Sequence, residues 1–213
     1  SFTVNAGSGP AITTQPANQT ACVGGNATFT IASTGTYQWQ VNTGSGFSNI
    51  AGATAATYTA TGVTISMTGN TYRCIVSGQC GTTTSSTVTL TVNTLPAVVT
   101  NPSNVAQCTG TSVSFSVGAS GSAITYQWQV NTNTSSPTWT NITAGNLPNH
   151  AGITYSGFTS ATLNLSAAPA TANNYQYRVI VTNSCGNVTS SSTILNPTPD
   201  APSIIVGGAL AIC

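Results

Sequence analysis

The feature that most constrains this chain is an internal repeat. The string "YQWQVNT" occurs twice, beginning at Tyr37 and at Tyr126, and "TYRCIV" from Thr71 returns as "QYRVIV" from Gln176. Upstream of each copy, "PAITTQPANQTAC" is matched by "PAVVTNPSNVAQC", and "PSIIVGGALAIC" at the end begins a further copy. Self-similarity at this spacing predicts an array of domains along one chain.

The repeat sets the expected domain boundaries. We expect the tail of a preceding repeat at 1–9, a first repeat at 10–94, a second at 95–198, and a linker with the first strand of a following repeat at 199–213. Because the chain starts and stops inside repeats and begins without a basic leader segment, we expect it to be a piece of a longer protein.

The second repeat is longer than the first. Trp39 and Tyr72 are 33 positions apart (72 − 39), whereas Trp128 and Tyr177 are 49 positions apart (177 − 128). The difference predicts an insertion in the second repeat, which we place around 143–159.

Apolar and polar residues alternate along short segments, which is typical of half-buried strands. Phe29 and Ile31 share one face of "ATFTIAS". Tyr37, Trp39 and Val41 share one face of "YQWQV", so its glutamines are expected to face outward. No segment has a helical stripe longer than one turn. Short β-branched strands separated by Gly-rich and Asn-rich turns predict an all-β fold of β-sandwiches.

A core tryptophan followed later by Tyr-x-Cys or Tyr-x-Val resembles the immunoglobulin fold, so we expect tandem immunoglobulin-like β-sandwich domains. The resemblance implies strand C for Trp39 and Trp128 and a tyrosine corner for Tyr72 and Tyr177. The strand B cysteine position instead holds Ile31 or Val117, and the strand F position holds Cys74 or Val179. The usual inter-sheet disulfide is therefore missing from both repeats. Cys74 is expected in the core as an unpaired thiol, with a bond to another chain or to a shuffled partner as the alternatives.

The longer string "QP.N.T.C.G..ATF…YQWQVNTGSGF.NI…YRCIVSG.CG" resembles the immunoglobulin-like repeats of very large Bacteroidota surface proteins, including gliding and adhesion proteins exported by type IX secretion. This resemblance implies secretion to the cell surface, an extended multi-domain chain and no enzymatic activity in the repeats.

Charged residues are almost absent, at 1% of the chain. Arg73, Arg178 and Asp200 are the formal charges, and His150 is the one histidine. Without clustered Lys and Arg, nucleic acid and anionic lipid are not expected as partners. One carboxylate side chain cannot supply paired-carboxylate catalysis or a calcium site, so we expect no enzyme activity, metal or cofactor. No apolar run approaches the ~20 residues of a membrane helix.

Six cysteines in so polar a chain favour disulfides in an oxidising compartment over zinc, because their spacing lacks a Cys-x-x-Cys pattern. Two sets recur in the repeats: Cys22, Cys108 and Cys213 in one, and Cys80 and Cys185 in the other. If the topology is the immunoglobulin one, Cys22 and Cys80 lie at opposite ends of their domain, beyond the ~7 Å Cα separation of a disulfide.

Two pairings remain open at this point. The first is an inter-domain bond, Cys22–Cys185, with Cys80 pairing to a preceding repeat, Cys108 to a following one, and Cys213 continuing the series. The second is pairing inside each domain, Cys22–Cys80 and Cys108–Cys185, which requires a non-standard strand layout.

Three functions remain open. The first is a structural segment of a long extracellular filament or adhesin stalk, whose partners are neighbouring repeats and other copies, packed laterally or end to end. The second is a glycan- or protein-binding module with a ligand-contact loop at the insertion, to which we assign Trp139, His150, Tyr155 and Phe158. Arg73 and Arg178, equivalent in the two repeats, are expected to stack on an aromatic ring or to bond a carbonyl, with ligand binding as the alternative. The third is an accessory domain of a larger secreted enzyme.

Overall fold

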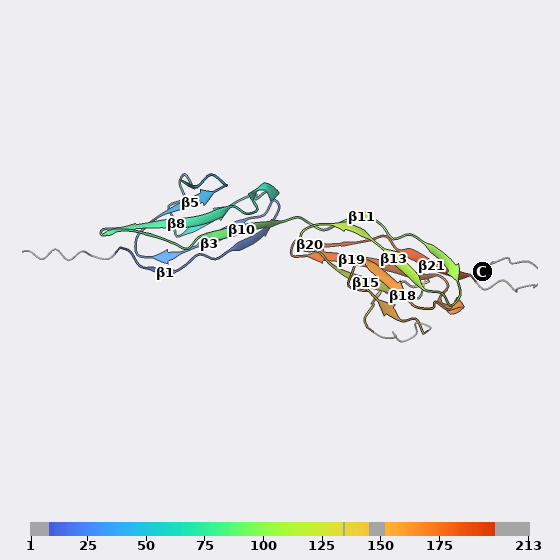
Figure 1. Cartoon of the computed structure of the whole chain (residues 1–213). Coiled ribbons are helices and arrows are strands. Elements are labelled where there is room, and N and C mark those ends of the chain that lie inside the picture. The colour runs from blue at the N-terminus through green and yellow to red at the C-terminus, as the bar shows by residue number, and fades with distance from the viewer. Residues whose placement is uncertain (1–8, 134, 145–151, 199–213) are drawn as a thin grey trace, which may run out of the picture. The chain divides into compact units, whose positions relative to one another are not determined.

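The computed structural model describes residues 9–133, 135–144 and 152–198 (Figure 1). The chain divides into two compact units, Ser1–Thr94 and Leu95–Cys213. Within the described residues both units are built from strands, apart from two single-turn 3-10 helices, η1 (Ile65–Met67) and η2 (Ala170–Ala172). The expected His150, Asp200 and Cys213 positions lie outside the described residues.

The larger sheet of the first unit is ordered β2-β10-β8-β5-β6. Its strands are β2 (Gln19–Cys22), β10 (Val88–Asn93), β8 (Thr71–Gly78), β5 (Thr36–Asn42) and β6 (Phe47–Asn49), and β9 (Gly81–Thr84) also pairs with β8. β2 runs parallel to β10, whereas the other pairs are antiparallel.

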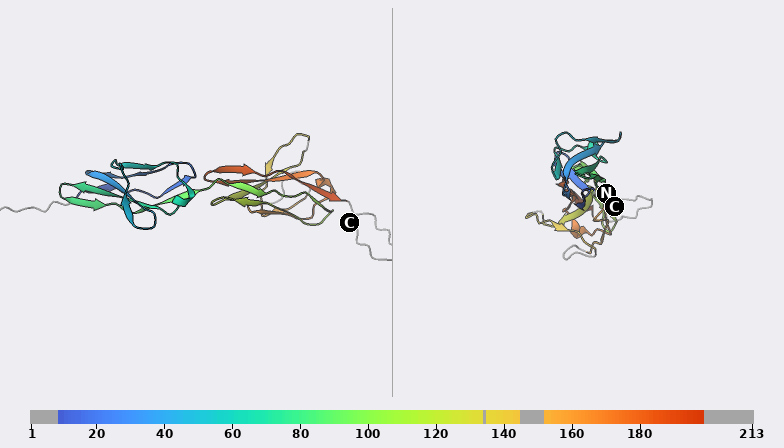
Figure 2. Two further views of the ribbon diagram at one scale, coloured as in Figure 1. Left: turned by 90° about the horizontal axis from the view of Figure 1, so that it is seen from above. Right: turned by 90° about the vertical axis from the view of Figure 1, so that its left-hand side faces the viewer.

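Two short ladders form the opposite layer of this unit. They are β1 (Ile12–Thr14) with β4 (Ala32–Ser33), and β3 (Ala27–Thr30) with β7 (Thr57–Ala60). The unit is therefore a β-sandwich, and its two layers are visible in the views of Figure 2.

The second unit repeats this plan. Its larger sheet is ordered β12-β21-β19-β15-β16, from β12 (Val105–Cys108), β21 (Thr193–Thr198), β19 (Tyr175–Asn183), β15 (Thr125–Asn131) and β16 (Thr140–Asn141), with β20 (Gly186–Thr189) pairing β19. The opposite layer contains β11 (Ala97–Thr100) with β14 (Gly118–Ser120), and β13 (Val113–Ser116) with β18 (Thr162–Leu165).

The two units differ at one strand. In the second unit β17 (Tyr155–Ser156) pairs antiparallel with β18, so this ladder has three strands, β13-β18-β17. The corresponding ladder of the first unit, β3-β7, has two. Because β17 lies in the residues that the first repeat lacks, the insertion adds a strand to the sheet.

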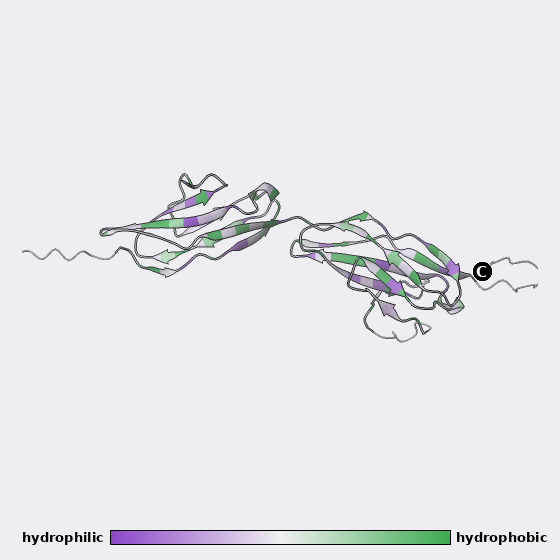
Figure 3. Cartoon of the chain, in the orientation of Figure 1, coloured by the Kyte–Doolittle hydropathy of each residue, from purple (hydrophilic) through white to green (hydrophobic). Residues whose placement is uncertain are grey.

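Each sandwich is filled by the alternating apolar residues, seen as bands of opposite hydropathy along the strands in Figure 3. Trp39 and Trp128 are fully buried, as are Phe29 and Tyr177. The indole Nε1 of Trp39 donates to the carbonyl of Ala55 at 3.0 Å. Among the described residues each buried side-chain nitrogen or oxygen has a hydrogen-bond partner, and these bonds together with the large buried side chains fix the packing of the two layers.

Two sequence expectations about these strands need refinement. The glutamines of "YQWQV" lie outside the apolar core, as expected, but Gln40 is only 9% exposed, and its amide bonds Arg73 and Asn49. A tyrosine corner requires the tyrosine hydroxyl to bond the backbone. The Tyr177 hydroxyl lies instead 3.2 Å from the hydroxyl of Tyr155, which the insertion supplies.

Candidate functional site

Cys22 lies at the C-terminal pole of the first unit, the end where the chain leaves it. The parallel β2–β10 register places Cys22 beside Asn93, and the N–H of Val23 donates to the Asn93 carbonyl at 3.0 Å. Thr94 is the last residue of the unit. The sequence therefore brings this cysteine to the segment that leads into the second repeat.

Cys80 lies at the opposite, N-terminal pole, in the turn between β8 and β9. A Cβ added at Gly78 in this turn would be 3.2 Å from Pro10, the start of the first repeat. Cys80 is exposed, carries a free thiol and lines a hollow of about 370 Å³ together with Gly9, Pro10 and Gln79. From Tyr72, level with Val88, β8 runs about 20 Å away from Cys22 to reach this turn.

The cysteines of the second unit occupy the same two poles. Cys108 is level with Thr198 at the C-terminal pole, and Cys185 lies in the β19–β20 turn at the N-terminal pole. The Asn183 side chain holds this turn, because its Oδ1 accepts the N–H of Cys185 at 2.8 Å and its Nδ2 donates to the Ser122 carbonyl at 2.9 Å.

Three of these cysteines are disulfide-bonded: Cys22, Cys108 and Cys185. Because Cys80 has a free thiol, the expected alternative Cys22–Cys80 bond does not form. Pairing of Cys108 with Cys185 inside the second unit is also excluded on distance. β19 runs from Tyr175, level with Leu195, about 25 Å away from the pole that holds Cys108.

Cys74 is the second free thiol among the described residues. It is fully buried opposite Trp39, in the core that also contains Ile31. Burial raises the pKa of the Cys74 thiol, so the reactive thiolate is disfavoured. This residue has the inert core role expected for it.

Arg73 and Arg178 sit in identical networks on the larger sheets. The Arg73 Nε donates to Gln40 Oε1 at 2.8 Å, and Gln40 Nε2 donates to Asn49 Oδ1 at 2.8 Å. The guanidinium lies over the Phe47 ring, 3.9 Å from its centre. These contacts tie together β8, β5 and β6. Of the two contacts expected for this arginine, the ring is present; the bond to the glutamine side chain was not predicted, because it depends on strand register.

The second unit repeats the network with a larger ring. Arg178 Nε donates to Gln129 Oε1 at 2.8 Å, Gln129 donates to Asn141, and the guanidinium lies 4.1 Å from the centre of the Trp139 ring. Desolvation lowers the pKa of Arg178. Because Arg178 covers one ring face, Trp139 has a stacking partner within its own sheet.

The described members of the expected ligand-contact loop do not form a common surface. Tyr155 is 5% exposed, and burial raises its pKa to about 12. Phe158 packs against the core, and its carbonyl accepts the backbone N–H of Trp128. Trp139 lies under Arg178, and His150 is outside the described residues. Tyr155 thus belongs to the core, whereas Phe158 and Trp139 are half-buried.

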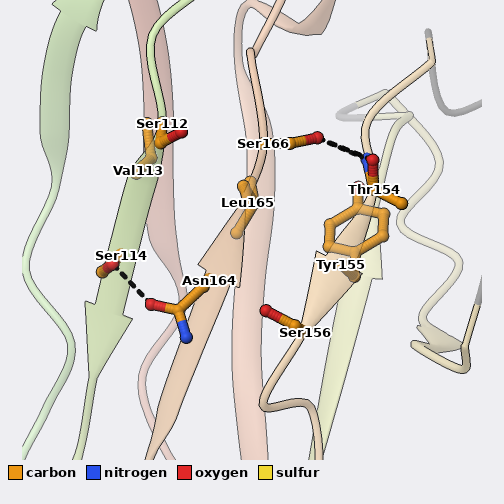
Figure 4. A pocket seen from close by; sticks show the side chains of 9 residues that line it. All are labelled: Ser112, Val113, Ser114, Thr154, Tyr155, Ser156, Asn164, Leu165 and Ser166. Carbon is orange, nitrogen blue, oxygen red and sulfur yellow. Dashed lines mark hydrogen bonds between the residues drawn. The ribbon is translucent and has the colours of Figure 1, made fainter.

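A shallow hollow of about 320 Å³ crosses β13, β18 and β17, and its polar lining is uncharged (Figure 4). The Ser114 hydroxyl donates to Asn164 Oδ1 at 2.7 Å, and the N–H of Thr154 donates to the Ser166 hydroxyl at 2.9 Å. Ser112 and Ser156 complete its polar rim. Hydroxyls and one amide can bond a neutral polar ligand. Tyr155 also lines the hollow, although its side chain is only 5% exposed.

The described residues contain no group of three or more His, Cys, Asp or Glu side chains that could hold a metal ion. Within the same residues no helix has the length and apolar character needed to cross a membrane.

Comparisons with known proteins agree with the fold. A family model described as a domain of unknown function, DUF8696, matches residues 11–94. Endoglucanase C of Cellulomonas fimi is 37% identical over 117 residues, which are 53% of this chain and 10% of that protein. The chain thus spans about a tenth of the length of this curated relative.

Solved immunoglobulin structures share the architecture. Titin domains I67–I69, in an E-to-A variant, match 90% of this chain and 66% of theirs with a TM-score of 0.60 and 19% identity. Immunoglobulin domains 1–4 of Sidekick-1 match 89% of this chain and 49% of theirs with a TM-score of 0.61 and 15% identity. The chain is therefore made of immunoglobulin-like β-sandwich domains. Identities this low establish the fold alone.

Proposed function

We propose that this chain is a structural segment of a long extracellular filament or adhesin stalk, built from disulfide-stapled immunoglobulin-like repeats. The observation that carries the proposal is the position of the bonded cysteines. Cys22 and Cys108 lie at C-terminal poles, Cys185 lies at an N-terminal pole, and each is bonded. Bonds at the poles restrain the junctions between domains, whereas a domain held shut needs a bond across its own core. Disulfides persist in oxidising surroundings, which supports an extracellular location.

The proposed staple is Cys22–Cys185. Cys22 is beside Asn93, two residues before Leu95, the first residue of the second unit. Within that unit the turn of Cys185 lies close to Leu95, because a Cβ at Gly186 would be 3.4 Å from the Leu95 side chain. Cys22 and the turn of Cys185 thus lie next to opposite ends of the same short segment, Asn93 to Leu95. A bond here contributes about 2–4 kcal/mol and limits bending at the junction.

We propose that equivalent bonds join this chain to a preceding and to a following repeat. The exposed thiol of Cys80 stands where a preceding repeat would offer its own C-terminal cysteine, and Cys108 stands where a following repeat begins. Cys213 continues the series. The partners proposed for this chain are thus neighbouring repeats, and the sequence resemblance supports a Bacteroidota surface protein exported by type IX secretion as the parent. We propose no catalytic role for these two repeats.

A map of disulfide-linked peptides tests the staple. The free thiols are blocked with N-ethylmaleimide, and the intact chain is digested with pepsin at acid pH, where thiol exchange is slow. We expect Cys22 and Cys185 in one linked peptide pair, and Cys108, which is also bonded, in a different linked peptide. A Cys22→Ser variant should release the Cys185 thiol, whereas Cys74→Ser should release none. Recovery of Cys185 linked to Cys108 would refute the staple.

The resemblance to Endoglucanase C supports a second candidate, an accessory segment of a larger secreted enzyme that contacts glycan or protein. The polar hollow across β13, β18 and β17 is the surface on which such contact would occur. We expect retention on insoluble glucan, reduced by Asn164→Ala, if this candidate holds. Absence of retention on glucan, together with rod-like X-ray scattering of the intact chain, would favour the stalk.

A further inference from the structure

The equivalent sheet edge carries an additional strand in the second unit but not in the first. In the second unit β18 lies between β13 and β17, and Figure 4 shows the labelled residues of the three strands side by side. In the first unit β7 is the counterpart of β18, because Phe29 pairs with Tyr58 as Phe115 pairs with Leu163. Among the described residues β7 has only β3 as a neighbour. Its outer edge is therefore open.

The hydrogen-bond register shows which backbone groups this edge presents. The N–H of Ile31 donates to the Ala56 carbonyl at 3.0 Å, which continues the β3–β7 ladder. In an antiparallel ladder, bonded pairs alternate with non-bonded pairs. Tyr58 is thus bonded toward β3, and the N–H and C=O groups of Thr57 and Thr59 point away from β3, into the open edge.

The second unit shows what such an edge binds. The N–H of Val117 donates to the Ala161 carbonyl, so by the same alternation the backbone of Asn164 points toward β17. There Asn164 pairs with Ser156, and the next bonded position is confirmed by the Ser166 N–H donating to the Thr154 carbonyl at 2.9 Å. Thr59 is the first-unit counterpart of Asn164. The same backbone position holds an antiparallel strand in one unit and none in the other.

Apart from its shortness, the β7 edge lacks the features that usually keep sheet edges apart. Natural edges carry charges, prolines or bulges that block pairing with another chain. The β7 sequence is Thr-Tyr-Thr-Ala, with Thr57 and Thr59 exposed and in regular register with β3. The whole chain has a net charge of +1, so copies repel one another little.

We propose that β7 is a self-association edge, which pairs antiparallel with β7 of a second copy of this chain. The edge is self-complementary about Tyr58. Thr57 of one copy bonds Thr59 of the second copy, and the reverse pair forms by two-fold symmetry. Cross-strand threonine pairs add to the backbone bonds. The proposal deepens the stalk function by locating lateral packing, and it rests on that function only for its role in fibres.

Four residues make a short edge, so a single contact is weak. In a long array of repeats, however, one engaged edge raises the effective concentration of the next. The first-unit repeat would thus supply lateral contacts, while a repeat with a β17 strand has its own edge covered. Insertion or loss of this strand sets which repeats of an array associate.

Sedimentation velocity over a concentration series tests the edge. The full chain carries Cys80→Ser with its disulfides intact, so that an intermolecular bond through Cys80 is not mistaken for edge pairing. We expect reversible dimers. Thr59→Pro removes the outward N–H at a position where an edge strand tolerates proline, and should weaken the dimer roughly tenfold or more. The matched Thr59→Ala variant keeps the N–H and loses only the cross-strand threonine contact, so it should weaken the dimer clearly less than Thr59→Pro does.

Amide exchange provides a readout that needs no substitution. Exchange at the N–H groups of Thr57 and Thr59 should slow as concentration rises, whereas exchange at Tyr58, which faces β3, should change little. A parent that stays monomeric throughout, or Thr59→Pro dimers as tight as the parent's, would overturn the edge proposal. Neither result bears on the proposed Cys22–Cys185 disulfide, because the map of linked peptides tests that bond whether or not the chain associates.

Discussion

The guanidinium of Arg73 lies 3.9 Å from the centre of the Phe47 ring and donates through Nε to Gln40. The side chain thus joins the central strands of the sheet to its edge strand β6. Because the same arrangement recurs with Arg178, Gln129 and Trp139, the two cations of the chain have a structural role in each unit.

Arg73→Lys should destabilise the first unit by about 1–2 kcal/mol, because an ammonium cannot stack flat on Phe47 while supplying the Nε bond to Gln40. Urea unfolding followed by tryptophan fluorescence measures the change. Arg178→Lys is the matched variant in the second unit and should lower that unit's transition instead. Equal stability of Arg73→Lys and the parent would show that the network is dispensable.

Cys74 and Cys80 should differ sharply in reactivity. Iodoacetamide is expected to modify the exposed Cys80 in the native chain and to reach Cys74 only after unfolding, because burial raises the pKa of the Cys74 thiol. Mass spectrometry of the labelled peptides gives the site. Rapid native labelling of Cys74 would mean that the core opens.

Replacement of Cys74 by valine, the residue at the equivalent position Val179, tests the same core. We expect Cys74→Val to change the free energy of unfolding by less than about 1.5 kcal/mol, as volume-conserving apolar exchanges usually do. A loss of several kcal/mol, measured by urea unfolding, would show that the thiol contributes more than packing.

Asn183 should control the geometry of the Cys185 turn. Asn183→Gly introduces the residue of the first repeat, Gly78, and removes both the bond to the Cys185 N–H and the bond to Ser122. We expect a loss of about 1–3 kcal/mol in the second unit and slower disulfide formation after reduction. Reoxidation followed by thiol counting measures the rate, and an unchanged rate would contradict a positioning role.

Most of the sandwich could be predicted from the sequence. Alternation alone places Phe29 and Trp39 each on the apolar face of its own strand, whichever strand it pairs with. The polar network around Gln40 could not be predicted, since it depends on which residues of β5, β6 and β8 lie level. The hydroxyl pair of Tyr155 and Tyr177 was missed for a related reason. Tyr155 lies in the insertion and has no equivalent in the first repeat, so comparison of the repeats could not indicate what it contacts.

One part of the cysteine prediction can be compared with the structure. Strand direction alone separated Cys22 from Cys80, and the free thiol of Cys80 agrees with that separation. The ligand-contact loop stays a prediction, but exposure had been assumed from the insertion, and one of its members, Tyr155, forms an added strand and is buried. An inserted segment that can complete a sheet buries its aromatic residues.

The pair Tyr155 and Tyr177 should make the second unit sensitive to high pH. Burial raises the pKa of Tyr155 to about 12 and that of Tyr177 still further, so the folded state holds protons that the unfolded state releases from about pH 10. Stability is therefore complete below pH 10 and falls as pH rises toward 12, by about 1.4 kcal/mol per pH unit for each tyrosine.

Urea unfolding at several pH values measures this slope, in a Cys74→Ser, Cys80→Ser background that prevents thiolate attack on the disulfides. Tyr155→Phe should cost about 1–3 kcal/mol at neutral pH, because the Tyr177 hydroxyl loses its partner. The same substitution should flatten the decline above pH 10, since one titrating group is removed. A decline as steep as that of the parent would place the alkaline sensitivity elsewhere in the chain.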